Sequence, residues 1–275
     1  HHPRLEGTAL VFDKPWEGRF SGYVTVLKDT GVFRMYYRGL PSAGGDGSNT
    51  ESTCYAESAD GLQWKKPELG IHKINGSAKN NVILKNEAPC SHNFSPFLDT
   101  NPAALPAARY KALAGTSSSG LVAFVSADGI HWKRAQPKAV ISRGAFDSQN
   151  VSFWSESEGL YLCYFRTWDG PTPWSGFRSI SRVTSKDFLS WSEPRAMSYG
   201  GTPREHLYTN QTQPYFRAPH IYLSVAARFM PGRRILSPAQ AKAIDVDPGY
   251  FSDCSDAVLM STRGGTLYSR TFMDA

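Results

Sequence analysis

The chain has 275 residues, of which 40% are hydrophobic and 20% are charged. This composition excludes disordered and fibrous chains, and all-β folds of this length form one unit, so we expect residues 1–275 to be a single domain. The net charge is +6, but Lys and Arg are scattered without a block of like charge, which disfavours nucleic acid as a partner. No run of about 18 apolar residues is present to span a membrane, so no membrane partner is expected.

Residues 1–6 do not form a signal peptide, and the sequence leaves a secreted, periplasmic or cytoplasmic location open. The cysteines lie far apart without a CxxC pair, which predicts neither a zinc site nor a thioredoxin-type motif, while a disulfide stays open. They are Cys54, Cys90, Cys163 and Cys254. Cys163 lies in an apolar run and is expected in the core. The seven histidines show no HxH or HExxH pattern, so we predict no metal site and no cofactor.

In chain order the sequence divides into four similar units, which begin near residues 8, 80, 138 and 200. Each unit opens with a strand preceded by polar residues, predicted at 18–24, 91–97, 146–153 and 207–215. Each continues with an aromatic and apolar run, at 32–38, 109–115, 160–166 and 221–228. Runs of this kind fit strands buried on both faces by neighbouring sheets.

Helical signal is nearly absent, with one exception in the fourth unit. Residues 237–243 are predicted to form a short inserted helix, with Ser237 as N-cap and Pro238 at the first helical position. The Gly-rich segment 44–49 is expected to be a surface loop, and 171–176 a loop that reaches over a central pocket.

A short motif recurs in step with these units. Ser58-Ala-Asp-Gly-Leu-Gln-Trp64 returns almost unchanged as 126–132, and more loosely as 185–191. A degenerate fourth copy is 261–265, with Tyr268 in place of Trp. The spacings of 68 and 59 residues suit a four-stranded antiparallel blade with its loops. Asp-Gly favours a tight turn and the Trp can pack between sheets, so we interpret the motif as structural.

On this Ser-x-Asp-Gly-x-x-Trp turn and the aromatic strand before it, the whole chain resembles the five-bladed propeller glycoside hydrolases, which include families 32, 43, 62, 68 and 130. It looks nearest to uncharacterised bacterial family-32-like hydrolases. The resemblance implies an all-β fold, a five-bladed β-propeller with about four blades visible in this chain. A fifth would need roughly another 60 residues, consistent with a fragment that lacks its closing blade. The Trp-x-Asn-Asp-Pro-Asn and Arg-Asp-Pro motifs of family 32 are missing.

Glycosidases of this kind place two carboxylates at the starts of the innermost strands, facing the central funnel. The resemblance therefore implies Glu17, Asp147 and Glu205 as catalytic candidates. In the second unit His92 and Asn93 occupy the corresponding place and suit substrate hydrogen bonding. The full set of predicted substrate-binding residues is Asp13, Arg38, His92, Asn93, Gln149, Asn150, Arg166, His206, Asn210 and Gln211. Trp16, Trp168 and Trp174 are candidates for stacking on sugar rings.

The predicted function is hydrolysis of a glycosidic bond in an oligo- or polysaccharide by paired carboxylates. Other functions stay open: a non-catalytic carbohydrate-binding propeller, a scaffold that binds protein, or a sialidase-like hydrolase of acidic sugars. The last rests on Arg38, Arg166 and Arg228, which end equivalent strands, although the sialidase turn motif has one more residue between Asp and Gly. The arginines could equally form salt bridges between blades, and the Asn and Gln residues could satisfy loop backbone groups.

Overall fold

A computed structural model describes residues 4–246 and 249–270; the first three and last five residues of the sequence lie outside this range. The described residues form four four-stranded sheets, here called blades 1 to 4. Blade 1 consists of β1 (Gly22–Asp29), β2 (Val32–Gly39), β3 (Ser52–Ser58) and β4 (Val82–Lys85). Blade 2 consists of β5 (Ser95–Leu98), β6 (Tyr110–Ala114), β7 (Val122–Ser126) and β8 (Lys133–Arg134), with short 3-10 turns at Cys90–His92 and Pro106–Ala108. Blade 3 consists of β9 (Val151–Ser155), β10 (Leu160–Trp168), β11 (Arg178–Ser185) and β12 (Arg195–Ala196).

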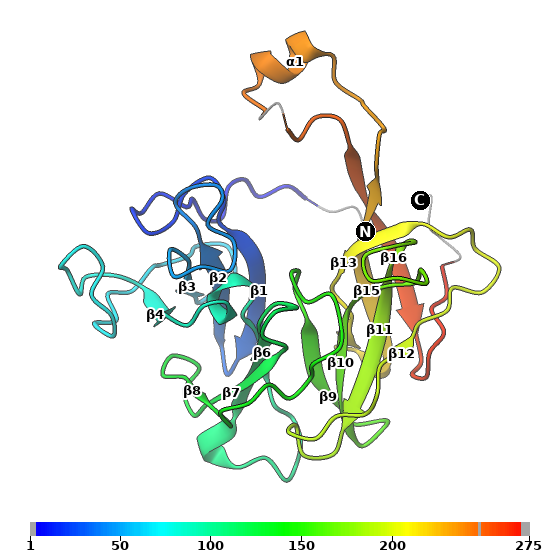
Figure 1. The fold of residues 1–275 in the computed structure, drawn as a ribbon. Helices are drawn as coiled ribbons and strands as arrows, with labels where there is room; N and C mark the ends of the chain where they lie inside the picture. Colours follow the sequence, from blue (N-terminus) through cyan, green and yellow to red (C-terminus); the bar gives the residue numbers. More distant parts are fainter. Residues whose placement is uncertain (1–3, 247–248, 271–275) are drawn as a thin grey trace.

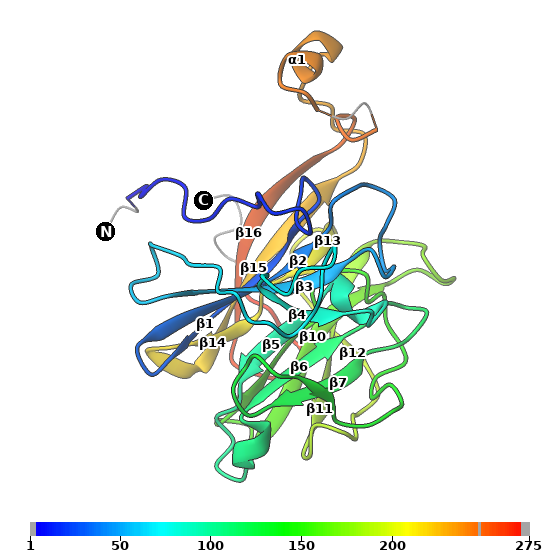
Figure 2. The same ribbon diagram turned by 90° about the vertical axis from the view of Figure 1, so that its left-hand side faces the viewer.

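Blade 4 is less regular than the other three. Its first strand is interrupted, because β13 (His206–Asn210) and β14 (Gln213–Tyr215) both pair with β15 (Ala218–Met230). The third strand is β16 (Cys254–Thr262), on which Ser269 makes a single outer bridge to Ser261. The predicted helix is confirmed as α1 (Pro238–Ala243), which projects away from the sheets between β15 and β16 (Figures 1 and 2).

The four blades follow one another around a common centre (Figure 1). Their first strands, β1, β5, β9 and β14, line one central cavity of 560 Å³. Sheets that share a central cavity through their first strands form a β-propeller. The propeller expectation is thus confirmed with four blades, while a fifth is not found among the residues that the structure describes.

The aromatic runs form the second strand of each blade and fill the spaces between blades, as predicted. Phe97 and Phe165 belong to the cluster between blades 2 and 3, and Tyr164 and Tyr222 to the cluster between blades 3 and 4. In blades 1 to 3 the opening strands begin later than predicted, because polar residues such as 91–94 and 146–150 lead into the strand and are not part of it. In blade 4 the strand begins at His206, one residue before the predicted start. Cys163 is buried in the core, and all four cysteines are free thiols.

The repeated motif closes the connection between the third and fourth strands of blades 1 to 3. In blade 1 the Asp60 carboxylate accepts backbone N–H groups of Leu62 and Gln63, both at 2.8 Å, and Trp64 Nε1 donates to the Gly61 carbonyl. The same bonds occur at 126–132 and 185–191, which confirms the structural interpretation. The proposed fourth copy differs, because Tyr268 is buried and its hydroxyl bonds that of Thr212.

The Asp187 turn of blade 3 predicts how the free energy of unfolding depends on pH. The backbone N–H groups of Ser190 and then Leu189 lower the pKa of Asp187. A lowered folded-state pKa adds stability that is fully present above the unfolded value of about 3.9 and is lost as pH falls through the folded value. We expect Asp187→Asn to lower the free energy of unfolding by about 1 kcal/mol at pH 7 and to make it less sensitive to acid below about pH 4. Urea unfolding at pH 7 and pH 3 measures this, and an equal loss at both would contradict it.

None of the helices in the described ranges has the length and apolar character to cross a membrane.

Candidate functional site

The strand order decides which residues meet at the propeller axis. Each regular blade has four antiparallel strands, an even number, so the chain returns to the same face before the next blade begins. We call this the upper face. Residues at the start of each first strand therefore gather there, around the axis.

Four such side chains line one pocket on the upper face, here called the axial pocket, with a volume of 360 Å³. They are Tyr23 from blade 1, His92 from blade 2, Asp147 from blade 3 and Tyr208 from blade 4. Asp46, from the loop between β2 and β3, adds a second carboxylate to the lining. Every blade thus contributes to this pocket, as in a site built on a shared axis.

Tyr23 is held by an irregularity in β1. The register between β1 and β2 shifts between Gly22 and Thr25, and Tyr23 adopts a left-handed φ of 50°. Such backbone strain in a non-glycine residue persists only where the surroundings enforce it. Its hydroxyl donates to the Asp147 carbonyl at 3.0 Å. Burial raises the pKa of Tyr23 to about 12, so the phenol stays protonated and keeps this bond at neutral pH.

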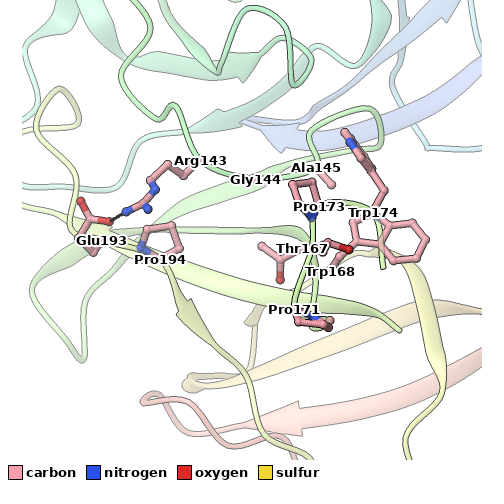
Figure 3. Close-up of a pocket in the computed structure, with 12 residues that line it drawn as sticks. Arg143, Gly144, Ala145, Thr167, Trp168, Pro171, Pro173, Trp174, Glu193 and Pro194 are labelled. Atoms are coloured by element: carbon pink, nitrogen blue, oxygen red, sulfur yellow. Dashed lines mark hydrogen bonds and ion pairs between the residues drawn. The ribbon is translucent and has the colours of Figure 1, made fainter. Parts of the chain in front are cut away.

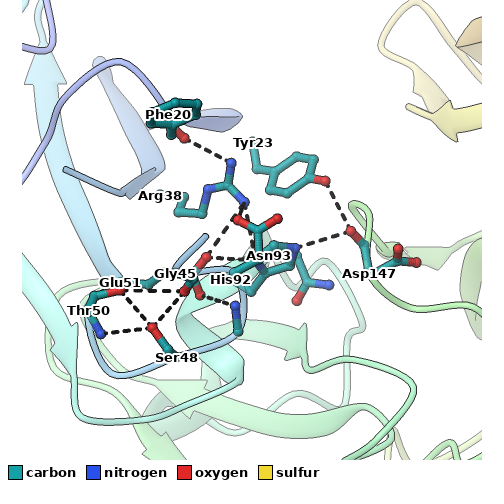
Figure 4. A network of polar contacts seen from close by, with 12 residues as sticks. Phe20, Tyr23, Arg38, Gly45, Ser48, Thr50, Glu51, His92, Asn93 and Asp147 are labelled. Atoms are coloured by element: carbon teal, nitrogen blue, oxygen red, sulfur yellow. Dashed lines mark hydrogen bonds and ion pairs between the residues drawn. The ribbon is translucent and has the colours of Figure 1, made fainter. Parts of the chain in front are cut away.

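A buried polar network supports the pocket floor (Figure 4). The carboxylate of Glu51, fully buried, lies 2.7 Å from His92 Nδ1, and His92 Nε2 lies 3.2 Å from the Asp147 carbonyl. The Arg38 guanidinium lies 3.6 Å from Glu51, donates to the Phe20 carbonyl at 2.8 Å and stacks over the ring of Tyr23. These contacts fix the His92 ring between blades 1 and 3.

Of the three predicted catalytic residues, Asp147 alone lines the axial pocket, and its side chain is 45% exposed. It is ion-paired with Arg166, which is buried at the upper end of β10 and stacks over Tyr208. Arg178 also packs over the Tyr208 ring, and burial together with the charge of Arg166 lowers the pKa of Arg178. Two arginines therefore lie beside Tyr208 at this pocket, and one of them, Arg166, is paired with the Asp147 carboxylate.

One group of potential metal ligands occurs among the described residues, and it lies here. Donor atoms of Asp46, Glu51 and His92 fall within 4.8 Å of one another. However, Arg38 Nη1 already lies 3.6 Å from Glu51 and 3.8 Å from Asp46, and Glu51 hydrogen-bonds His92 directly. A guanidinium that supplies the positive charge in this way makes the group an ion-pair cluster, so we assign no metal to it.

The structure places Glu17 in the interior of blade 1 and not in the axial pocket. Its carboxylate is fully buried and accepts from Lys66 Nζ and the Tyr37 hydroxyl, both at 2.6 Å. Asp13 lies at the surface beside it, and the hydrogen bond from Lys66 lowers the pKa of Asp13. Trp16 packs on the core of the same blade and donates to Asn81. Asp13 and Glu17 thus both bind the Lys66 ammonium group, which explains why these two carboxylates lie close together before β1.

Glu205 and its neighbours lie at the start of blade 4, outside the axial pocket. Its carboxylate accepts from Arg228 at 3.0 Å and forms an ion pair with Arg270. Arg228 also binds Asp256, so this arginine does not join Arg38 and Arg166 at the axis. His206 accepts the backbone N–H of Arg178, and burial and then the Arg178 charge lower the pKa of His206.

The amide side chains predicted to bind substrate mainly bond protein groups. Asn93 and Asn150 both donate to the Ser148 carbonyl at 2.9 Å, and Asn93 also binds the Gly115 backbone. Gln149 donates to Thr25 and accepts from Gln211, which ties blades 1, 3 and 4 across the axis. The Asn210 amide oxygen accepts from Thr212. These bonds satisfy loop backbone groups and link neighbouring blades around the axis.

Sequence reasoning missed Tyr23, Asp46, Glu51 and Tyr208. Tyr23 and Tyr208 occupy equivalent places in their own blades, because each lies at a register shift between the first and second strands. They do not align with His92 or Asp147, so the repeat did not mark them as site residues. Asp46 and Glu51 lie in or beside the loop between β2 and β3, whose sequence does not repeat in the corresponding loops of the other units, so the repeat gave no signal for them.

No known protein-family profile matches this sequence, and no curated protein matches it. Solved structures are similar in fold. One is an N-acetylgalactosamine deacetylase from F. plautii in complex with blood group B trisaccharide, with 11% identity, a TM-score of 0.54, and coverage of 88% of this chain and 72% of that one. Another is an α-L-arabinofuranosidase from Clostridium thermocellum, with 13% identity, a TM-score of 0.52, and coverage of 88% and 68%.

A third similar structure comes from work on the GH130 family of mannoside phosphorylases and on glycoside hydrolases that target β-1,2-mannosidic linkages in Candida mannan. It shows 15% identity, a TM-score of 0.51, and coverage of 92% of this chain and 70% of that one. At such identities the likeness establishes the fold. The chain therefore shares the β-propeller fold of these structures.

Proposed function

We propose that this protein is a glycoside hydrolase and that the axial pocket is its active site. The observation that carries the proposal is the convergence of first-strand residues from all four blades on a pocket that holds two accessible carboxylates, Asp46 and Asp147. Hydrolysis of a glycosidic bond needs two such groups, one to donate a proton and one to act as base or nucleophile. The solved propellers named above include glycosidases, which supports this chemistry for the fold.

The two carboxylates have different surroundings, which suggests different roles. Asp147 is ion-paired with Arg166 and its backbone is fixed by Tyr23 and His92, so it suits the negatively charged base or nucleophile. The role of proton donor then falls to Asp46, the other carboxylate of the pocket, which is 72% exposed on its loop and lies 3.8 Å from Arg38. A separation of about 5 Å between the two groups in the substrate complex would give retention, and roughly 6.5 to 9.5 Å inversion.

A screen of aryl glycosides and of oligosaccharides tests the proposal. The protein is incubated with each substrate, and released phenol or reducing ends are measured. We expect turnover of at least one substrate, lost in Asp46→Asn and in Asp147→Asn. Turnover that survives unchanged in both variants would place the active site elsewhere.

A second candidate function, carbohydrate binding without hydrolysis, is favoured by the Asp147–Arg166 ion pair, because the carboxylate already has a strong partner. In that case the screen gives no turnover, while calorimetric titration with the same sugars shows binding. The two arginines at the axis, Arg38 and Arg166, suit an acidic sugar in either function, which is how we retain the sialidase-like alternative.

Several finer predictions stay predictions. They are the closer relation to family 32, the catalytic roles of Glu17 and Glu205, and the fifth blade. The outer face of blade 4 is the surface that a fifth blade would cover, because Val225 and Leu259 pair across β15 and β16 and are each 50% exposed.

A further inference from the structure

A second pocket opens on the upper face of blade 3, away from the axis, with a volume of 530 Å³ (Figure 3). We call it the side pocket. Its walls combine two tryptophans, Trp168 at the end of β10 and Trp174 in the following loop, with prolines and the ion pair between Arg143 and Glu193. Flat aromatic surfaces beside charged hydrogen-bonding groups match the two faces of a sugar ring, whose C–H groups stack while its hydroxyls bond.

The Trp174 side chain is exposed to solvent. It is 54% exposed, and the residue adopts a left-handed φ of 64° that a bulky residue seldom takes. The loop around it is fixed by bonds from Gly170 N–H to the Ser175 carbonyl at 2.9 Å and from Phe177 N–H to Asp169 at 2.7 Å. An exposed tryptophan held on a braced, strained loop adds little to the core, which indicates a binding role.

The other wall is rigid as well. Trp168 meets Trp174 edge to face, with ring centroids 6.3 Å apart and planes at 73°. Arg178 stacks on Trp168 at 4.6 Å, and His206 supports the same ring at 6.2 Å. The two indoles thus form a corner whose inner wall cannot easily move.

The opposite end of the side pocket is polar. Arg143 and Glu193 form an ion pair of 2.8 Å, with side chains 76% and 79% exposed (Figure 3). A pair this exposed contributes little to stability. Its donors and acceptors are instead available to hydroxyl groups of a ligand lying against the tryptophans.

The side pocket adjoins the axial pocket. Ala145 lines the side pocket and Asp147 the axial pocket, and two residues span at most about 7 Å. On the neighbouring strand, Thr167 and Trp168 of the side pocket directly follow Arg166, the partner of Asp147. Ala145 N–H donates to the Arg166 carbonyl at 2.9 Å, which holds the two segments together.

We infer that the side pocket binds one neutral sugar ring of an oligosaccharide whose next unit occupies the axial pocket, with Trp174 as the stacking platform. This inference rests on the proposed function, because it takes the axial pocket as a sugar site. It defines the ligand class as an oligosaccharide of at least two units. Trp174 is then the residue by which the protein prefers oligosaccharides to monosaccharides.

The full chain is first applied to a printed array of plant, microbial and animal oligosaccharides and their monosaccharides. The oligosaccharide bound best and its monosaccharide are then titrated by calorimetry against wild type and Trp174→Ala; where the wild type turns the sugar over, KM replaces the affinity. We expect Trp174→Ala to lower the affinity for the oligosaccharide by about tenfold and to leave the affinity for the monosaccharide unchanged. Trp174→Phe should retain most of the affinity, since the ring is kept.

Phe216→Ala is the matched control, because Phe216 is also an exposed aromatic residue, 78% exposed in the turn between β14 and β15, and it lines neither pocket. It should bind like wild type. Oligosaccharide binding that is unchanged in Trp174→Ala would overturn the inference and leave the proposed function standing. No binding to any sugar on the array would overturn both. Binding of a decaproline peptide that depends on Trp174, without sugar binding there, would make the side pocket a peptide site and also overturn the inference.

Discussion

Replacement of Asp147 by Asn is expected to lower kcat for the substrate found in the screen by about 10² to 10⁴, the range typical for loss of an acid or base group. Asn keeps the size of the side chain and the bond from Arg166, but it removes the negative charge that a base or nucleophile needs. The backbone contacts from Tyr23 and His92 to the Asp147 carbonyl are untouched by this change. We therefore expect the variant to fold normally, with a thermal midpoint within a few degrees of wild type.

Glu87→Gln is the control for this experiment. Glu87 also pairs with an arginine, Arg134, at 2.7 Å, and it is partly exposed but lies outside the axial pocket. Its replacement should leave kcat unchanged. If Asp147→Asn kept wild-type kcat and KM, Asp147 would have no catalytic role and the carbohydrate-binding candidate would gain support.

The second large effect is expected at Glu17, and it is an effect on stability. Glu17→Ala removes the fully buried carboxylate of an ion pair and leaves the Lys66 ammonium, with its side chain only 10% exposed, without its closest carboxylate. Breaking a buried pair in this way costs about 3 kcal/mol or more. It also leaves the Tyr37 hydroxyl without its acceptor. Urea unfolding followed by tryptophan fluorescence should show this loss in the free energy of unfolding.

The double variant Glu17→Leu with Lys66→Met separates this role from catalysis. It removes both charges at once, so it should recover much of the stability lost in Glu17→Ala. Activity in the double variant should match wild type if Glu17 is structural. Wild-type stability of Glu17→Ala together with lost turnover would instead support the catalytic role that the sequence predicted for it.

Much of the architecture was readable from the sequence because it repeats. The turn motif uses local bonds between Ser, Asp and nearby backbone N–H groups, and such bonds form wherever those residues occur at that spacing. The aromatic runs are continuous because strands between two sheets are buried on both faces. Ser237 and Pro238 likewise determine the start of α1 locally, through a capping box with Gln240.

The functional residues depended on contacts that no local pattern contains. Glu17 precedes the first strand, as a catalytic carboxylate would, but Lys66, 49 positions later, draws it into the interior of blade 1. In the same way, ion pairs with Arg228 and Arg270 hold Glu205 outside the axial pocket. Asp147 keeps an accessible side chain because its partner, Arg166, lies below it in the adjacent strand.

The sequence by itself thus determined the blade, since the blade is made by short-range turns and by the burial of continuous apolar strands. Only the tertiary structure decided which polar residues reach the axis. An ionised side chain must find a partner when it leaves water, and that partner is chosen by packing between distant segments. The pocket formed by Tyr23, His92, Asp147 and Tyr208 joins residues from four blades, and it exists only once the blades surround the axis.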